Sequence, residues 1–389
     1  MRDVQVGFIQ VVGSTWDGHV QPSEFFECLS GIYAVNRILI WVLCLSIASE
    51  TVLGVAVSTA RACSRVVHTS RDGKLVVTGR NMDWFEDIQS NLWLFPSGLE
   101  HDGAVSKNPH RWTSRYGSVI TAGFDVGTTD GLNEKGLAVN LLYLAEADFG
   151  ERDVSRPGVS WSAYAQYLLD TYATVAEAVA GERGDKIQLV ASPLPGSVSK
   201  PPALHFSLSD ATGDSAIFEH IQGKLLIHHG REFRVMTNSP IFDEQLALNK
   251  YWDTVGGDAM LPGTRRAADR FVRASFYEKR LPNPTTSRQA VANVMSVMRN
   301  VSAPFGEPDA AHPNISATIW RTVADHTNRV YYFESTSSPS LVWVRLDSVD
   351  LKKGSPVKRL KLGEAFEYSG DVSSKFEATK PFAFVGPKE

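Results

Sequence analysis

Residues 63–84 have the sequence CSRVVHTSRDGKLVVTGRNMDW, in which two β-prone runs flank a turn. The runs are Val66-Val67 and Leu75-Val76-Val77, and the polar, glycine-containing stretch 71–74 connects them. This stretch therefore predicts a β-hairpin over residues 63–83. Because the second strand returns beside the first, we expect Arg80 and Asp83 to lie near Cys63.

Cys63 is the candidate nucleophile. The chain has three cysteines, Cys28, Cys44 and Cys63, so nothing after Cys63 can form a disulfide framework. If the chain is cut before Cys63, the thiol and a free α-amine share one residue. That amine has an ordinary pKa of about 7.7–8.0, so it can accept the thiol proton without help from a histidine. Arg80 would favour the thiolate, and Asp83 would hold or orient the amine. The alternative for these two residues is a surface ion pair of little energetic weight.

The segment before Cys63 has the features of an export signal. Arg37 is followed by a long apolar run and then by Ala60-Arg61-Ala62, the small-x-small pattern that signal peptidase recognises. We therefore expect residues 1–62 to be a leader that is removed, and residues 63–389 to form a single hydrolase domain. The product would be periplasmic or secreted, without stable membrane insertion. The alternative is a retained membrane anchor over 38–57, which has about the length of a bilayer span.

The composition argues against several kinds of partner. The 389 residues are 43% hydrophobic and 21% charged, which is typical of a globular protein. The net charge of −4 offers no basic excess for nucleic acid. His228 and His229 are neighbours in a predicted strand and would point to opposite faces, so they cannot easily bind one metal together. We expect no metal, no cofactor and no nucleic-acid partner.

The rest of the chain combines strand and helix patterns. Apolar residues at spacings of three and four predict one amphipathic helix over 161–179. The other expected elements are strands at 116–126, 137–144, 204–210, 215–221, 224–229, 233–238, 318–325, 329–335 and 340–346, and helices at about 242–252, 266–280 and 285–299. This order of elements predicts an α+β layered domain.

Five motifs occur in a family order. They are Cys63 behind a processing site, GRNMDW (79–84), NEKGLAVNLLYL (133–144), VMTNSPIFDEQL (235–246) and ADRFVRASF (268–276). Together they make residues 63–389 resemble the choloylglycine hydrolase and penicillin V acylase family, in its Gram-negative-type branch. The resemblance implies the four-layer αββα fold of N-terminal-nucleophile hydrolases, with two stacked, mostly antiparallel sheets between helix layers.

The resemblance also implies roles for single residues. Cys63 would be the nucleophile and its amine the base, with Arg80 and Asp83 beside it. The side-chain amide of Asn238 and the backbone N–H of Tyr143 would hold the oxyanion, and preorganised donors of this kind usually contribute the largest catalytic effect. Arg270 would be the second arginine of the active site. Without the family motifs, Asn238 could equally cap a turn, Arg270 would belong to a solvated helix face, and Tyr143 would be a core residue.

The implied activity is hydrolysis of a linear, non-peptide amide, as in a penicillin V acylase. We expect a small-molecule substrate with an apolar or aromatic acyl group, contacted by Met82, Trp84, Tyr143 and Leu144. N-acyl homoserine lactones and conjugated bile salts are alternative substrates. The family also implies a homo-oligomer, with a homotetramer expected. A hypothesis of another class is a catalytically silent binding protein on the same fold.

Overall fold

The computed structural model of the chain describes residues 63–194, 202–257, 259–306, 316–338, 340–363 and 368–387. The predicted leader over 1–62 and its processing site lie outside these residues, so the expected cut before Cys63 stays a prediction. Residues Thr59–Glu389 form one compact unit. Within the described part of this unit, no helix is long and apolar enough to cross a bilayer.

The predicted hairpin is confirmed. Strand β1 (Ser64–Thr69) pairs with β2 (Val76–Trp84) in antiparallel fashion, and Arg65 stands opposite Arg80. The hairpin lies inside a seven-stranded sheet of order β14-β1-β2-β15-β16-β17-β19. Its other strands are β14 (Val235–Met236), β15 (Ala317–Asp325), β16 (Val330–Ser335), β17 (Leu341–Arg345) and β19 (Gly370–Asp371).

A second sheet of nine strands has the order β13-β12-β11-β8-β7-β6-β3-β18-β20. All of its pairings are antiparallel. Its strands are β3 (Asn91–Phe95), β6 (Ser118–Gly123), β7 (Gly127–Asn133), β8 (Ala138–Tyr143), β11 (Leu204–Ser209), β12 (Ser215–Ile221), β13 (Lys224–His229), β18 (Lys358–Leu360) and β20 (Glu377–Ala378). Two small sheets add β4 (Glu100–Asp102) with β5 (Arg111–Thr113), and β9 (Gly158–Ser160) with β10 (Gln188–Val190).

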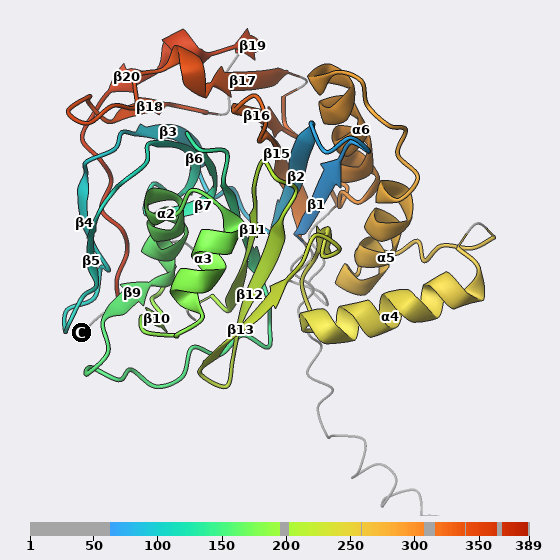
Figure 1. Ribbon diagram of the computed structural model, residues 1–389, viewed down its shortest axis with the longest axis horizontal. Coiled ribbons are helices and arrows are strands. Elements are labelled where there is room, and N and C mark those ends of the chain that lie inside the picture. Colours follow the sequence, from blue (N-terminus) through green and yellow to red (C-terminus); the bar gives the residue numbers. More distant parts are fainter. Residues whose placement is uncertain are drawn as a thin grey trace, which may run out of the picture. The chain divides into compact units, whose positions relative to one another are not determined.

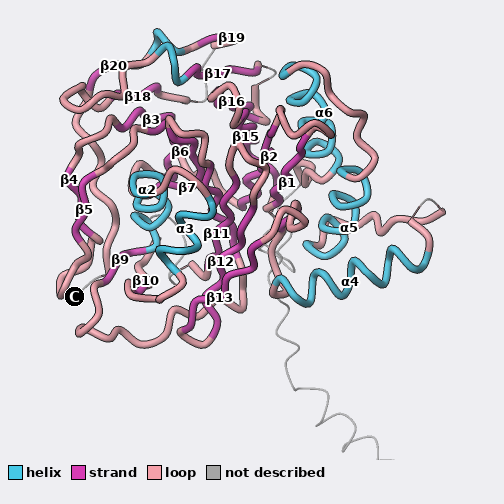
Figure 2. The backbone as a smooth tube through the Cα atoms, in the orientation of Figure 1, coloured by secondary structure: helices cyan, strands magenta, loops and turns pink. Residues whose placement is uncertain are grey.

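Helices cover the outer face of each sheet. Helices α5 (Ala267–Glu278) and α6 (Ser287–Asn300) contact β1, and α4 (Phe242–Val255) contacts α5. Helices α2 (Trp161–Thr171) and α3 (Val175–Glu182) contact strands of the nine-stranded sheet (Figure 1). Figure 2 shows the two sheets running between these helix groups. The order helices, sheet, sheet, helices is the predicted αββα arrangement.

Alternation along the strands of the nine-stranded sheet divides the core in two. In β3, Leu92 belongs to the cluster shared with the hairpin, whereas Trp93 belongs to the cluster under α2 and α3. Val119 and Ile120 of β6 divide in the same way. Successive side chains of a strand point to opposite faces, so one sheet serves both cores. The face shared with the hairpin contains the candidate site.

One expectation about elements was wrong, and several strands were not expected, among them a central one. The helix expected over 161–179 is two helices, because Tyr172 is extended and the Thr174 side chain accepts a hydrogen bond from the Glu177 backbone N–H, which starts α3. Strand β7 was not expected at all. Its sequence GTTDGLN has one aliphatic residue, yet every residue is buried between β6 and β8.

Candidate active site

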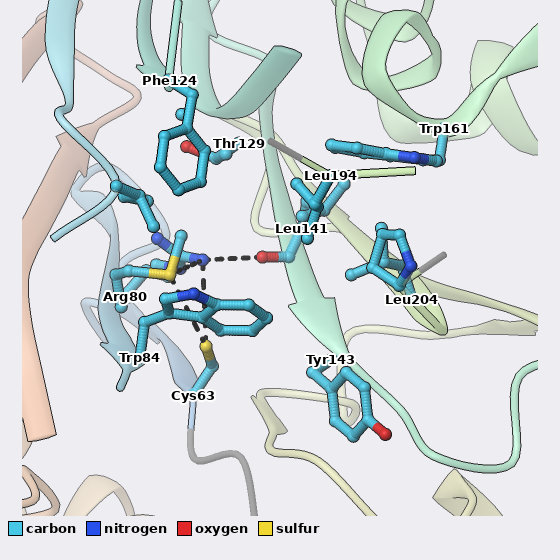
Figure 3. Close-up of a pocket in the computed structure, with 14 residues that line it drawn as sticks. Cys63, Arg80, Trp84, Phe124, Thr129, Leu141, Tyr143, Trp161, Leu194 and Leu204 are labelled. Carbon is cyan, nitrogen blue, oxygen red and sulfur yellow. Dashed lines mark hydrogen bonds between the residues drawn. The ribbon is translucent and has the colours of Figure 1, made fainter. Parts of the chain in front are cut away.

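Cys63 stands directly before β1 and is 2% exposed. Its thiol faces a pocket whose wall also includes Arg80 (Figure 3). The sulfur lies 3.7 Å from the Asp83 carbonyl oxygen and 4.0 Å from the Met82 sulfur, both on β2. The hairpin register is therefore what brings the thiol beside the GRNMDW motif.

Arg80 is fully buried on β2 and links the two sheets. Its Nη2 donates to the Leu141 carbonyl of β8 at 2.7 Å and lies 3.9 Å from the Cys63 sulfur. Its guanidinium carbon lies 4.4 Å from the centre of the Trp320 ring, a cation–π contact. A rigid positive charge thus stands near the thiol, as the hairpin pattern predicted.

Asn238 follows β14 and reaches both Cys63 and Tyr143. Its Oδ1 accepts from the Cys63 backbone N–H and, at 2.9 Å, from Arg270 Nη2. Its Nδ2 donates to the Tyr143 carbonyl oxygen at 2.6 Å. These neighbours fix the amide orientation, because two donors face Oδ1 and an acceptor faces Nδ2. The structure therefore brings together the two residues expected to hold an oxyanion.

Arg270 is fully buried on α5 and contacts the start of the hairpin. Its Nη1 donates to the Cys63 carbonyl and to the Ser64 hydroxyl, and it lies 3.9 Å from Asp83 Oδ2. Asp83, also fully buried, accepts a hydrogen bond from the Thr318 hydroxyl. The two arginines and the aspartate thus surround the candidate nucleophile from β2 and α5, and Arg270 does not belong to a solvated helix face.

Burial dominates the electrostatics of these groups. It raises the pKa of the Cys63 thiol, although the charges of Arg80 and Arg270 act in the opposite direction. It also raises the pKa of Asp83 to about 6, against the opposing effects of Arg270 and Thr318. A thiol with a raised pKa needs a base before it can attack a carbonyl carbon. The α-amine of a first residue is such a base.

The pocket beside Cys63 has about 510 Å³ of empty space, a value that includes space open to solvent. Met82, Trp84 and Tyr143, three of the residues expected to contact substrate, line it. The fourth, Leu144, is fully buried, its backbone N–H donates to the Ala203 carbonyl, and it is not part of the lining. Alternation at the end of β8 turns its side chain away from that of Tyr143.

Much of the pocket wall was not predicted. Ile88, Phe124, Leu141, Trp161, Leu194 and Leu204 line it, and they come from segments far apart in the chain. Figure 3 shows Phe124 and Trp161 across the pocket from Cys63. Each looks like an ordinary core residue in sequence, so no local pattern could have found them. Among the described residues, no group of three or more histidines, cysteines or carboxylates could hold a metal ion.

The four-layer fold, with the hairpin that starts at Cys63 in one inner sheet, places the chain in the N-terminal-nucleophile class of hydrolases. The family model for linear amide C–N hydrolases, choloylglycine hydrolase family, matches residues 63–359. The penicillin V acylase of Pectobacterium atrosepticum is 45% identical over 374 residues, which are 90% of this chain and 98% of that protein. The solved structure of the penicillin V acylase from Agrobacterium tumefaciens has 49% identity and a TM-score of 0.77, and the match covers 83% of this chain and all of that one. A bile salt hydrolase/transferase of Clostridium perfringens is 23% identical over 327 residues, covering 77% of this chain and 96% of that protein.

The chain belongs to the choloylglycine hydrolase family of linear amide C–N hydrolases. The family resemblance of its motifs is thereby confirmed, and so are the fold and the activity class that follow from it. It is an enzyme that acts on small-molecule amides.

Proposed function

We propose that this enzyme removes an apolar or aromatic acyl group from a small-molecule amide, in the manner of a penicillin V acylase, with Cys63 as its nucleophile. The observation that carries the proposal is the Cys63 thiol in the wall of an apolar pocket, 3.9 Å from Arg80 Nη2. The high identity to two penicillin V acylases supports the choice of substrate. Phe124, Trp161 and Trp84 give the pocket aromatic surfaces that suit a phenoxyacetyl group.

The reaction proceeds in two steps once Cys63 is the first residue. Its α-amine accepts the thiol proton, and the sulfur attacks the carbonyl carbon of the amide. The Asn238 side-chain amide and the Tyr143 backbone N–H stabilise the oxyanion. The C–N bond then breaks, and the amine leaves with the proton carried by the α-ammonium. Water attacks the resulting thioester, which releases the carboxylic acid and restores the thiol.

The charged residues around Cys63 hold the nucleophile and the oxyanion donors in place. Arg270 fixes the Cys63 carbonyl, Arg80 favours the thiolate, and Asp83 orients the amine by its negative charge. Because Cys63, Asn238 and Arg270 are joined by hydrogen bonds, the nucleophile and the oxyanion donor are positioned as one unit.

Export and assembly belong to the same proposal. Removal of residues 1–62 would free the Cys63 amine and deliver the enzyme to the periplasm or the medium, and the mature chain would form a homo-oligomer, with a homotetramer expected. Intact mass of the protein recovered from the periplasm and sedimentation of the purified enzyme test these two statements.

An amide panel tests the substrate class. A protein made to start at Cys63 should release acid from penicillin V faster than from an N-acyl homoserine lactone or a glycine-conjugated bile salt. Faster turnover of either alternative would replace the proposed substrate while keeping the mechanism.

Removal of the nucleophile separates an enzyme from a silent binding protein. We expect Cys63→Ala to lose hydrolysis by at least about 10³-fold while the protein still folds and binds penicillin V, because the proposed mechanism forms its covalent intermediate on the Cys63 sulfur. A Cys63→Ala variant that matched the wild type would show that Cys63 is not the nucleophile. If the wild type bound penicillin V without hydrolysing any amide of the panel, the binding-protein hypothesis would be correct.

A further inference from the structure

Helix α4 begins four residues after Asn238 and lacks a local cap. Its N-cap residue is Ile241, which has no side-chain hydrogen bond to the first turn. Serine, threonine, asparagine or aspartate usually fills this position, because the first backbone N–H groups of a helix have no partner within it. The start of α4 therefore depends on a residue from elsewhere in the fold.

Glu219 of β12 supplies that cap. Its two carboxylate oxygens lie 3.1 and 3.2 Å from the backbone nitrogen of Phe242, the first residue of α4. Glu219 is 1% exposed. A negative charge at the first turn also interacts favourably with the helix dipole. A buried glutamate from the nine-stranded sheet thus fixes where α4 begins.

Two histidines hold the Glu219 carboxylate. His205 Nδ1 lies 3.2 Å from Oε1, and His228 Nε2 lies 3.3 Å from Oε2. Burial raises the pKa of Glu219, but the hydrogen bond from His205 and the close contact with His228 outweigh it and bring that pKa down to about 2. Glu219 is therefore ionised at neutral pH. The cluster therefore holds a fixed, buried negative charge at the start of α4.

Helix α4 in turn holds Asn238. Gln245, one turn into the helix, donates from Nε2 to the Asn238 carbonyl oxygen at 2.9 Å. The connecting Ser239 accepts from the Ala145 backbone N–H at 3.0 Å. The segment 238–242 is thus fixed at Asn238 by Gln245 and at Phe242 by Glu219. A shift of the helix start would move the Asn238 amide relative to Cys63.

We propose that Glu219, clamped by His205 and His228, is a positioning residue that sets the Asn238 amide for the oxyanion through the start of α4. The inference rests on the proposed function, because it assigns Glu219 to the oxyanion donor of that mechanism. It predicts that Glu219 affects the step that forms an oxyanion much more strongly than it affects the reactivity of the thiol.

The test compares two reactions of Cys63 in a protein that starts at this residue. Hydrolysis of the best amide passes through an oxyanion, whereas alkylation by iodoacetamide displaces iodide and forms none. We expect Glu219→Gln to lower kcat by about tenfold or more, since small misplacements of catalytic groups can cost up to about 10²-fold. The loss should stay below that of Asn238→Ala, because removal of one oxyanion donor costs about 10²–10³ in kcat. KM should change by less than about twofold. The alkylation rate should fall far less than kcat, because alkylation forms no oxyanion and depends on Asn238 only through its contact with the Cys63 nitrogen.

Two further variants sharpen the result. Glu182→Gln is the matched control, since Glu182 is also a buried glutamate but accepts from the hydroxyls of Tyr164, Tyr167 and Tyr172, away from the site. It should leave kcat unchanged. Gln245→Leu cuts the link from α4 to Asn238 and should reproduce the loss of kcat. Combined with Glu219→Gln, it should add little, because both act through one loop.

Each outcome has one meaning. Unchanged kcat in Glu219→Gln would overturn the inference, and so would an equal fall of hydrolysis and alkylation, which would indicate a general loss of structure. If Glu219→Gln did not fold, normal kcat in Gln245→Leu would overturn it as well. A wild type that alkylates at Cys63 but hydrolyses no amide would instead contradict the proposed function.

Discussion

Asp83 is a fully buried carboxylate 3.9 Å from Arg270 Nη1. The charge of Arg270 and the hydrogen bond from Thr318 favour the ionised carboxylate. Desolvation by burial outweighs them and raises the pKa of Asp83 to about 6. In an unfolded chain the same group ionises near pH 3.9. Between these two values the folded protein keeps a proton that the unfolded chain has lost. The contribution of Asp83 to stability therefore falls as the pH rises from about 4 to about 6.

Asp83→Asn should remove this dependence. Relative to the wild type, the variant should gain unfolding free energy between pH 4 and pH 7, by an amount on the order of 3 kcal/mol for a shift of about two pKa units. Urea unfolding at the two pH values measures the change. Asp72→Asn, in the exposed hairpin turn, is the control. Because the pKa of Asp72 is lowered, its contribution to stability is lost only as the pH falls below about 4, so this variant should follow the wild type between pH 4 and pH 7. A difference between Asp83→Asn and wild type that is equal at both pH values would contradict the burial argument.

The residues of the site differ in how far the sequence could predict them. The hairpin spacing alone indicated that Arg80 and Asp83 lie near Cys63. Asn238 and Arg270 required the family motifs, because α5 reaches β1 only through packing of distant segments. No local sequence pattern indicates that Glu219, His205 and His228 belong near the site. Their relation to Asn238 exists only because β11, β12 and β13 are neighbours beneath the start of α4.

At the scale of elements, Gly79 shows how closely helix α6 packs on the hairpin. A Cβ atom at Gly79 would lie 2.5 Å from Val294 Cγ1 and 2.6 Å from Met298 Cγ, both on α6. Such distances require the helix or its side chains to move. Gly79 also precedes Arg80, so the displacement would begin beside the active site.

Gly79→Ala should destabilise the protein by about 1–3 kcal/mol, the usual cost of overpacking a core. Denaturant unfolding measures this loss, and hydrolysis should fall as well if Arg80 moves with β2. Gly263→Ala is the control, since a Cβ there meets nothing within 4 Å, and it should change stability by less than about 0.5 kcal/mol. Equal stability of the two variants would show that α6 does not constrain the hairpin.

Periodicity predicted most elements but not their interruptions. The apolar spacing from Trp161 to Val179 continues through the break at 172–174, so it could not separate α2 from α3. The pair Thr174 and Glu177 was the local signal, because a threonine followed three residues later by glutamate is typical of a helix start. Strand β7 gave no such signal. At Gly131 a glycine stands where an apolar side chain would mark a strand, because a Cβ atom there would lie 2.8 Å from Leu169 Cδ1 of α2.

At the scale of the whole molecule, the order of strand and helix patterns predicted an α+β layered domain, and the family motifs implied its four layers. The pocket could not be predicted in the same way, because β2, β8, β11 and α2 each contribute only one to three of its residues. The same packing buries Cys63 and raises the pKa of its thiol. No histidine of the described residues lines the pocket beside Cys63, so the proposed mechanism depends on a base supplied by the first residue of the processed enzyme.

The N-terminus of the active enzyme tests this dependence most directly. Intact mass and N-terminal sequencing of the active protein should give a chain that begins at Cys63. A variant that keeps a single glycine before Cys63 should bind substrate but hydrolyse no amide, because its Cys63 nitrogen is an amide and cannot accept the thiol proton. Full activity in a chain that retains residues before Cys63 would contradict the mechanism.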